Sequence, residues 1–194
     1  MPSPIGHAIA GTAVAWTADI VDGRRSSGRL LTTCALLATT ADLDLIWPPF
    51  HRQATHSLIA VLMVFIIAAA VTGRVTDLRA TRFGGQARWR VALVCAIAYG
   101  THLLLDWLAV DKFPPAGIQL LWPFVRRYFI SGWDLFAQTE RRDLLAPASI
   151  DQNVRAVAQE LLILAPIAAA LWLVRKKALA RLPPEMSRRD HAAQ

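Results

Sequence analysis

Five long apolar segments divide the chain, with short polar or basic stretches between them. Their approximate bounds are 5–21, 30–47, 56–73, 91–110 and 156–174. Each is close to the roughly 20 residues that a helix needs to cross a bilayer core. The first two segments are the least apolar, so we expect them to be tilted or partly interfacial. The pattern predicts an all-α fold: an integral membrane bundle of about five transmembrane helices.

The same pattern predicts one membrane-embedded helical domain, 1–174, with an outer segment at 111–155 and a polar, basic tail at 175–194. Ser or Pro in the Pro2-Ser3-Pro4 stretch is expected to open the first helix. We expect the second helix to stop at Pro48-Pro49, and Thr55 to be the N-cap of the third. Cys34 and Cys95 both lie in apolar segments, which favours packing over a disulfide.

Composition and charge support a membrane location. Hydrophobic residues make up 55% of the chain, which makes a soluble globule the weaker interpretation. The net charge is +7. The basic residues lie mainly between and after the apolar segments, around 24–29, 74–90 and 175–189. With five crossings these stretches share one side, which the positive-inside rule makes cytoplasmic. The outer segment is also basic, so the rule is satisfied only in part, and no nucleic-acid partner is expected.

This topology brings unusual polar residues to one membrane depth, near the outer ends of the helices. They are His7, Asp42, Asp44, His51, His56, His102, Asp106 and Glu160. A carboxylate in the middle of a membrane helix costs about 2.5–3.5 kcal/mol on insertion scales. A divalent cation neutralises several such groups at once, so the convergence favours a metal site over separate structural roles.

Spacing adds detail to this hypothesis. His102 and Asp106 are four residues apart, so they share a helix face and can bind one ion, or can form a hydrogen-bonded pair between helices. Asp42 and Asp44 are about 200° apart around a regular helix. Either the helix loosens ahead of Pro48, or one carboxylate binds the metal while the other orients a ligand. Histidine nitrogen with carboxylate oxygen suits zinc best, with manganese or iron possible.

Four short motifs lie between positions 42 and 124 of the chain. They are Asp42-Leu43-Asp44, His51-Arg52-Gln53-Ala54-Thr55-His56-Ser57, His102-Leu103-Leu104-Leu105-Asp106 and Leu121-Trp122-Pro123-Phe124. Together they resemble the YdjM-like family of membrane-bound proteins described as metal-dependent hydrolases. The resemblance implies a bacterial-type inner membrane and a site made of His7, Asp42, Asp44, His51, His56, His102 and Asp106. The His/Asp layout is more distantly similar to zinc-dependent phospholipase C and P1-type nucleases, which implies phosphoester cleavage.

We therefore expect a metal-dependent hydrolase, phosphoesterase-like, that acts on a membrane lipid or lipid-linked substrate at the outer face. The expected metal ligands are His7, His56, His102 and Asp106 with Asp42 or Asp44. His51 or Glu160 is expected to move protons, and Arg52, Arg126 and Arg127 to hold a phosphate. Two alternatives remain open: a proton or ion translocator, and a haem-binding protein.

Overall fold

The computed structural model describes residues 1–46, 51–77, 84–141 and 143–181, and its secondary structure within those ranges is helical. The α-helices are α1 (Pro4–Asp22), α2 (Gly28–Thr40), α3 (Leu58–Asp77), α4 (Gly84–Leu108) and α5 (Pro147–Ala180). Two 3₁₀ helices, η1 (Ala41–Ile46) and η3 (Ala54–His56), lie between α2 and α3. No strand occurs in these ranges, which contain two isolated β-bridges. The prediction of an all-α fold is confirmed.

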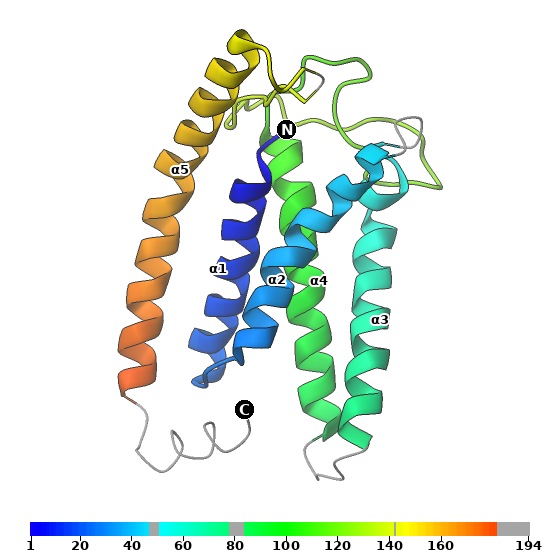
Figure 1. Cartoon of the computed structure of the whole chain (residues 1–194). Coiled ribbons are helices and arrows are strands. Elements are labelled where there is room, and N and C mark those ends of the chain that lie inside the picture. The colour runs from blue at the N-terminus through cyan, green and yellow to red at the C-terminus, as the bar shows by residue number, and fades with distance from the viewer. Residues whose placement is uncertain (47–50, 78–83, 142, 182–194) are drawn as a thin grey trace.

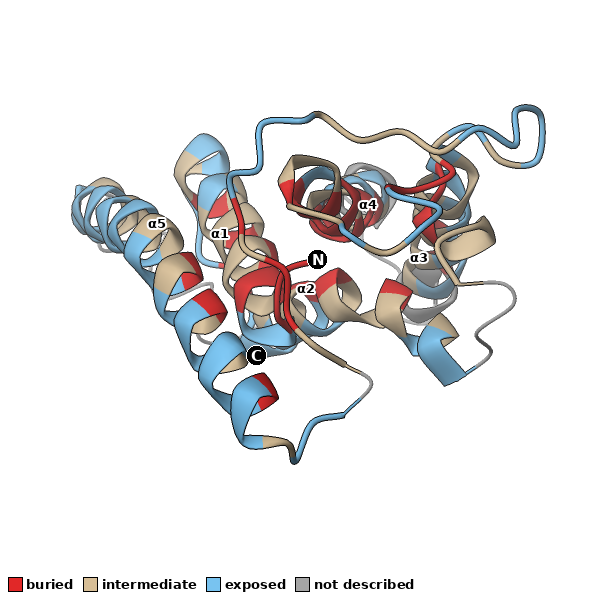
Figure 2. Cartoon of the chain, turned by 90° about the horizontal axis from the view of Figure 1, so that it is seen from above, coloured by how far each residue is buried: buried red, intermediate tan, exposed pale blue. Residues whose placement is uncertain are grey.

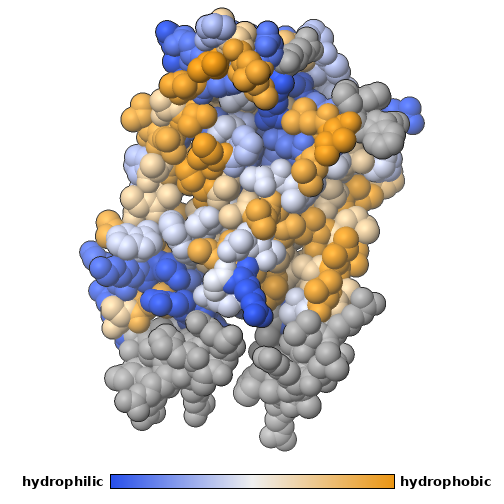
Figure 3. Space-filling model, in the orientation of Figure 1, coloured by the Kyte–Doolittle hydropathy of each residue, from blue (hydrophilic) through white to orange (hydrophobic). Residues whose placement is uncertain are grey.

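Helix α4 lies at the centre of the bundle. It packs against α1, α2 and α3, while α5 packs along α1 at the edge (Figure 1). Buried residues lie on α4 and on the helix faces turned toward it, whereas α5 is exposed along most of its surface (Figure 2). On the face that Figure 3 shows, hydrophobic residues form large patches along the helices, and hydrophilic ones gather at the top right and lower left. Exposed apolar side chains occur on all five α-helices, and we call them the apolar belt; such a surface is expected of a bundle in lipid.

Local sequence explains the ends of α1. The Ser3 hydroxyl accepts a hydrogen bond from the backbone N–H of Gly6, and Pro4 begins the helix, as predicted. The helix ends at Gly23, whose φ of 59° is the left-handed conformation that glycine adopts without strain. Between these ends Gly11 faces α2, where a Cβ would lie 2.3 Å from the carbonyl oxygen of Cys34. The missing side chain therefore sets how closely α1 and α2 approach.

Several predicted helix boundaries differ from the observed ones. The second α-helix ends at Thr40, and the chain continues as the 3₁₀ helix η1; the predicted stop at Pro48-Pro49 lies outside the described residues. Ser57, not Thr55, caps α3, because the Ser57 hydroxyl accepts from the N–H of Ala60. Helix α5 begins well before 156 and continues to Ala180, so the first residues of the predicted tail are helical.

The five-span prediction is not confirmed. Within the described ranges two helices are long and apolar enough to cross a membrane, with spans Arg88–Leu108 and Pro147–Ala180. The apolar part of α3, Leu58–Gly73, is shorter. Helix α2 has 13 residues, so at about 1.5 Å per residue it reaches only about 20 Å, less than the roughly 30 Å of a hydrocarbon core.

The segment between α4 and α5, residues 109–146, covers one end of the bundle, beside the N-terminus (Figures 1 and 2). We call it the covering segment. Backbone hydrogen bonds attach it to the start of α3 through Leu58 N and Leu120 O (2.9 Å) and to the 51–57 turn through Gln119 N and Arg52 O (2.9 Å). Within this segment the side chain of Ile118 is fully buried. This cover holds η1, η3 and the end of α4 together, where the polar residues lie.

Candidate metal centre

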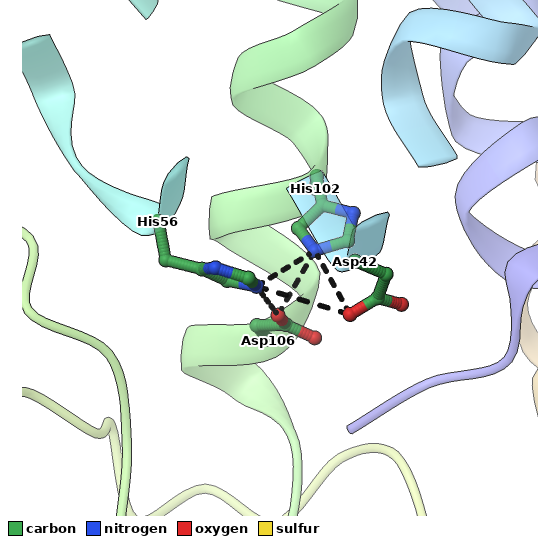
Figure 4. A group of neighbouring side chains, drawn as sticks. All are labelled: Asp42, His56, His102 and Asp106. Carbon is green, nitrogen blue, oxygen red and sulfur yellow. Dashed lines mark hydrogen bonds and ion pairs between the residues drawn. The ribbon is translucent and has the colours of Figure 1, made fainter. Parts of the chain in front are cut away.

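Four side chains converge at the covered end of the bundle, and we call them the His/Asp cluster: Asp42, His56, His102 and Asp106. They come from η1, η3 and α4 (Figure 4). One ligand atom from each lies within 4.8 Å of the others. All but Asp42 are buried, so the cluster sits inside the protein with one side toward the surface.

The protonation pattern of the two cluster histidines favours a cation. The Nδ1 atom of His102 lies 2.8 Å from the carbonyl oxygen of Ala38, and that of His56 lies 3.1 Å from Asp44. If each Nδ1 donates and neither ring carries a second proton, both Nε2 lone pairs face each other at 3.1 Å. Two lone pairs at that distance repel unless a positive charge lies beside them.

Asp106 completes the inner side of the cluster. Its Oδ2 lies 3.1 Å from His102 Nε2 and 3.3 Å from His56 Nε2. Neither carboxylate oxygen makes a well-formed hydrogen bond to any described residue, although both are buried. An uncompensated buried carboxylate is costly, and these oxygens and ring nitrogens are the donor types that zinc, manganese and iron bind. The residues present therefore fit a divalent metal.

His7 lies beside the cluster. Its ring stacks on His102 at 3.9 Å between centroids, and its Nε2 is 3.5 Å from Asp106 Oδ1. Both ring nitrogens of His7 are buried without a hydrogen-bond partner among the described residues. His7 is thus placed to contact a second ion or a bound water on the α1 side of Asp106.

Asp44 lies outside the His/Asp cluster, on the Nδ1 side of His56. Its carboxylate accepts from the N–H of Arg52 (3.0 Å), from the hydroxyl of Thr55, and bonds the Nδ1 atoms of His56 and His51. Burial raises the pKa of Asp44, but the hydrogen bonds from His51 and His56 outweigh it and hold that pKa well below its usual range. The carboxylate is therefore charged and orients His56 from the side opposite the cluster.

The carboxylates on either side of His56 favour a positive charge on or beside its ring. Burial lowers the pKa of His56, but the close carboxylates of Asp106 and Asp44 and their charges outweigh it and raise the pKa to about 9. The negative charges of Asp44 and Asp106 would stabilise either a proton on the His56 ring or a cation bound in the cluster.

Arg141 is a site residue that the sequence did not reveal. Its guanidinium binds both oxygens of Asp42, at 3.0 and 3.2 Å, and the carbonyl oxygen of Pro2 at 3.0 Å. It comes from the covering segment, 99 positions away from Asp42. No local motif marks it, because the pairing depends on how the segment folds over the bundle.

A surface pocket of about 480 Å³ lies at the same end of the bundle, and one of its lining residues, Arg141, binds Asp42 of the cluster. His51, Arg52 and Arg141 line it, together with Tyr128 and Glu140. Arg52 forms an ion pair with Asp111, and its Nε is buried without a partner among the described residues. The pocket is thus lined both by His51, which contacts Asp44, and by Arg141, which binds Asp42.

Other predicted site residues lie apart from this pocket. Glu160, on α5, is buried and accepts hydrogen bonds from the backbone N–H (2.7 Å) and the hydroxyl of Ser3, so its contacts fix the start of α1. Arg126 and Arg127 are exposed on the covering segment, with Arg127 stacked 6.0 Å from the centre of the Phe129 ring. The structure brings none of these three residues to the His/Asp cluster.

The sequence model of the YdjM inner membrane protein family matches residues 1–179. The chain belongs to this family. It is therefore a membrane protein, and the match includes all four cluster residues as well as His7, Asp44 and Arg141. Comparisons of this YdjM family member with curated proteins and with solved structures gave no match. The similarity to zinc-dependent phospholipase C and P1-type nucleases stays a prediction.

Proposed function

We propose that this YdjM family protein is a metal-dependent hydrolase that cleaves a phosphoester of a membrane lipid or lipid-linked substrate. One observation carries the proposal: a buried His/Asp cluster with the donor set of a hydrolytic metal site is joined, through the Arg141–Asp42 ion pair, to a pocket lined by arginines. A divalent metal held there, zinc in the first instance, would lower the pKa of a bound water and polarise the scissile group.

The protein's own groups have separate tasks in this proposal. His56, His102, Asp106 and Asp42 hold the metal, and His7 holds a second ion or the attacking water. Asp44 keeps His51 oriented by their 2.5 Å contact, and His51 lies in the pocket wall, where it can take or return a proton.

Arg52 and Arg141 supply the phosphate-binding groups of the pocket. A guanidinium carries five N–H donors. Arg141 uses four of them on Thr139, Asp42 and Pro2, whereas Arg52 bonds Asp111, Phe113 and Pro115 through Nη1. Planar guanidinium groups bind phosphate oxygens in pairs, which favours a phosphoester over a neutral amide or ester. The apolar belt around the bundle favours a substrate that is itself in the membrane.

The first test is metal content. The chain purified in mild detergent should contain at least one zinc, manganese or iron per chain by elemental analysis. The paired change His102→Ala and Asp106→Ala should remove it, and Asp151→Asn, an exposed carboxylate on α5, is the control. An unchanged metal content in the double variant contradicts the site. An optical spectrum of the same sample detects haem, the alternative ligand of these histidines.

The second test is turnover of a panel of phospholipids and polyprenyl phosphates in detergent. Activity should disappear with a chelator, return with metal, and be lost in Asp106→Asn but kept in Asp151→Asn. A metal-loaded preparation that cleaves amides or carboxylic esters instead refutes the substrate class and leaves the metal site standing.

The proposal places the pocket at the outer face and the basic end of the bundle in the cytoplasm, following the positive-inside rule. A cysteine substituted for Pro115, in the pocket wall, should react with a membrane-impermeant thiol reagent in intact cells. A cysteine substituted for Arg25, at the opposite end, should not. Because Cys34 and Cys95 are buried, the background should be low. The reverse labelling pattern would place the site on the cytoplasmic face.

A further inference from the structure

The end of the bundle opposite the His/Asp cluster contains a groove that the proposed hydrolase does not use. Helix α2 crosses α4 obliquely, so that α2 and α3 lie apart toward this end (Figure 1). The space between them, about 760 Å³, has α4 as its floor, with Leu37, Val64 and Val71 among its apolar walls. We call it the basic groove because arginines line its mouth.

Four arginines line that mouth: Arg24, Arg25, Arg29 and Arg90. Arg90 forms an ion pair with Asp22 through its Nε. The other three are exposed and form no ion pair with any described residue. The groove therefore joins an apolar channel to an excess of positive charge, at the level where a helix bundle meets lipid headgroups.

Polar groups in the lining add to the positive character of the mouth. The hydroxyl of Ser26 is buried and has no hydrogen-bond partner among the described residues, and the same holds for Nη2 of Arg90. Both residues line the groove. The N-terminus of α2 lies at the same place, and its partial positive charge favours an anion. These residues and the N-terminus of α2 make this wall of the groove electropositive, which suits an anion.

A second groove of the bundle lacks this excess of positive charge. It lies between α1, α4 and α5, has a volume of about 580 Å³, and is almost entirely apolar. The charged residues that line it are Arg90 and Asp22, which pair with each other. That groove fits any acyl chain, whereas the basic groove adds unpaired arginines and free donors to an apolar channel.

We propose that the basic groove binds an anionic phospholipid, with its phosphate between the arginines and an acyl chain along α2, α3 and α4. Basic pockets between membrane helices are established sites for anionic headgroups. The lipid here would be a bound component of the bundle at the end opposite the hydrolytic pocket, so the inference does not depend on the proposed reaction.

The test measures lipid binding by the full chain in neutral detergent, using native mass spectrometry and thermal unfolding. Phosphatidylglycerol should bind and raise the unfolding temperature, whereas phosphatidylcholine of the same chains and inorganic phosphate should not. The double variant Arg25→Gln with Arg29→Gln should bind phosphatidylglycerol roughly 30-fold more weakly, at about 1 kcal/mol per arginine. The matched control, Arg126→Gln with Arg127→Gln, makes the same charge change at the other end and should bind as the parent does.

A steric variant tests the apolar part without changing charge. Val71→Trp should fill the groove and weaken phosphatidylglycerol binding, whereas Leu162→Trp, on the exposed face of α5, should not. The proposal is overturned if both arginine pairs weaken binding equally, if phosphatidylcholine binds as tightly, or if inorganic phosphate stabilises the protein as well. It is also overturned if Val71→Trp binds phosphatidylglycerol like the parent chain.

Discussion

Replacing Asp44 by asparagine separates a residue that orients a ligand from one that binds the metal. In the structure Asp44 contacts four donors, including His56 Nδ1 and the hydroxyl of Thr55, and lies outside the His/Asp cluster. Asparagine has the same shape but carries no charge, and one of its two polar atoms becomes a donor that faces other donors. The change should let the ring of His56 rotate while every cluster side chain stays present.

The size of the effect follows from these contacts. Carboxylates that hold a metal-bound histidine typically contribute 10–100-fold to metal affinity, so Asp44→Asn should cost about 1.4–2.7 kcal/mol of binding free energy. Asp42→Asn removes a charged member of the cluster itself. If about 10–16 kcal/mol of zinc binding is shared over four ligands, that loss is roughly 2.5–4 kcal/mol, or about two to three powers of ten.

The assay is competition for zinc between the purified protein and a chromophoric chelator of known affinity. Asp44→Asn should keep the full metal stoichiometry at a weaker affinity, and Asp42→Asn should lose more. Asp151→Asn should match the parent. If Asp44→Asn lost all its metal while Asp42→Asn kept it, the two roles would be reversed. Equal affinities in all three variants would refute the cluster as a metal site.

Two further predictions concern stability, measured as unfolding temperature in detergent. Arg175→Met should destabilise the protein by about 3 kcal/mol, because it leaves the fully buried carboxylate of Asp19 without its 2.7 Å ion pair; Lys176→Met is the control, and equal losses would refute the reasoning. Gly11→Ala should also destabilise, by about 1–3 kcal/mol, because the new methyl group meets the Cys34 carbonyl. An unchanged or raised unfolding temperature would show that the helix propensity of alanine, worth about 1 kcal/mol, outweighs the contact.

Local patterns in the sequence predicted the helices well and their ends less well. Long apolar segments are sufficient to predict helices, and a Ser-Pro start or a glycine end marks α1 directly. The end of α2 at Thr40 was not predicted, because an apolar segment has the same composition in either kind of helix. The sequence did leave open a departure from regular α-helix ahead of Pro48, which η1 shows. Thr55 was a plausible cap by type, but its hydroxyl is used by Asp44, a contact made across the turn.

The sequence by itself determined that His102 and Asp106 share one face of a helix, since that follows from the 3.6-residue period. It also predicted, from an expected five crossings, that His7, Asp42 and His56 lie at the same end; the structure brings them together, although five spans are not confirmed. Two residues apart, Asp42 and Asp44 point in different directions in either kind of helix. Only the tertiary structure decided that Asp42 faces the cluster while Asp44 contacts the Nδ1 of His56. Likewise, only tertiary structure brought Arg141 to Asp42 and took Glu160 to Ser3. These contacts join distant parts of the chain, and no local period or motif encodes the packing that brings them together.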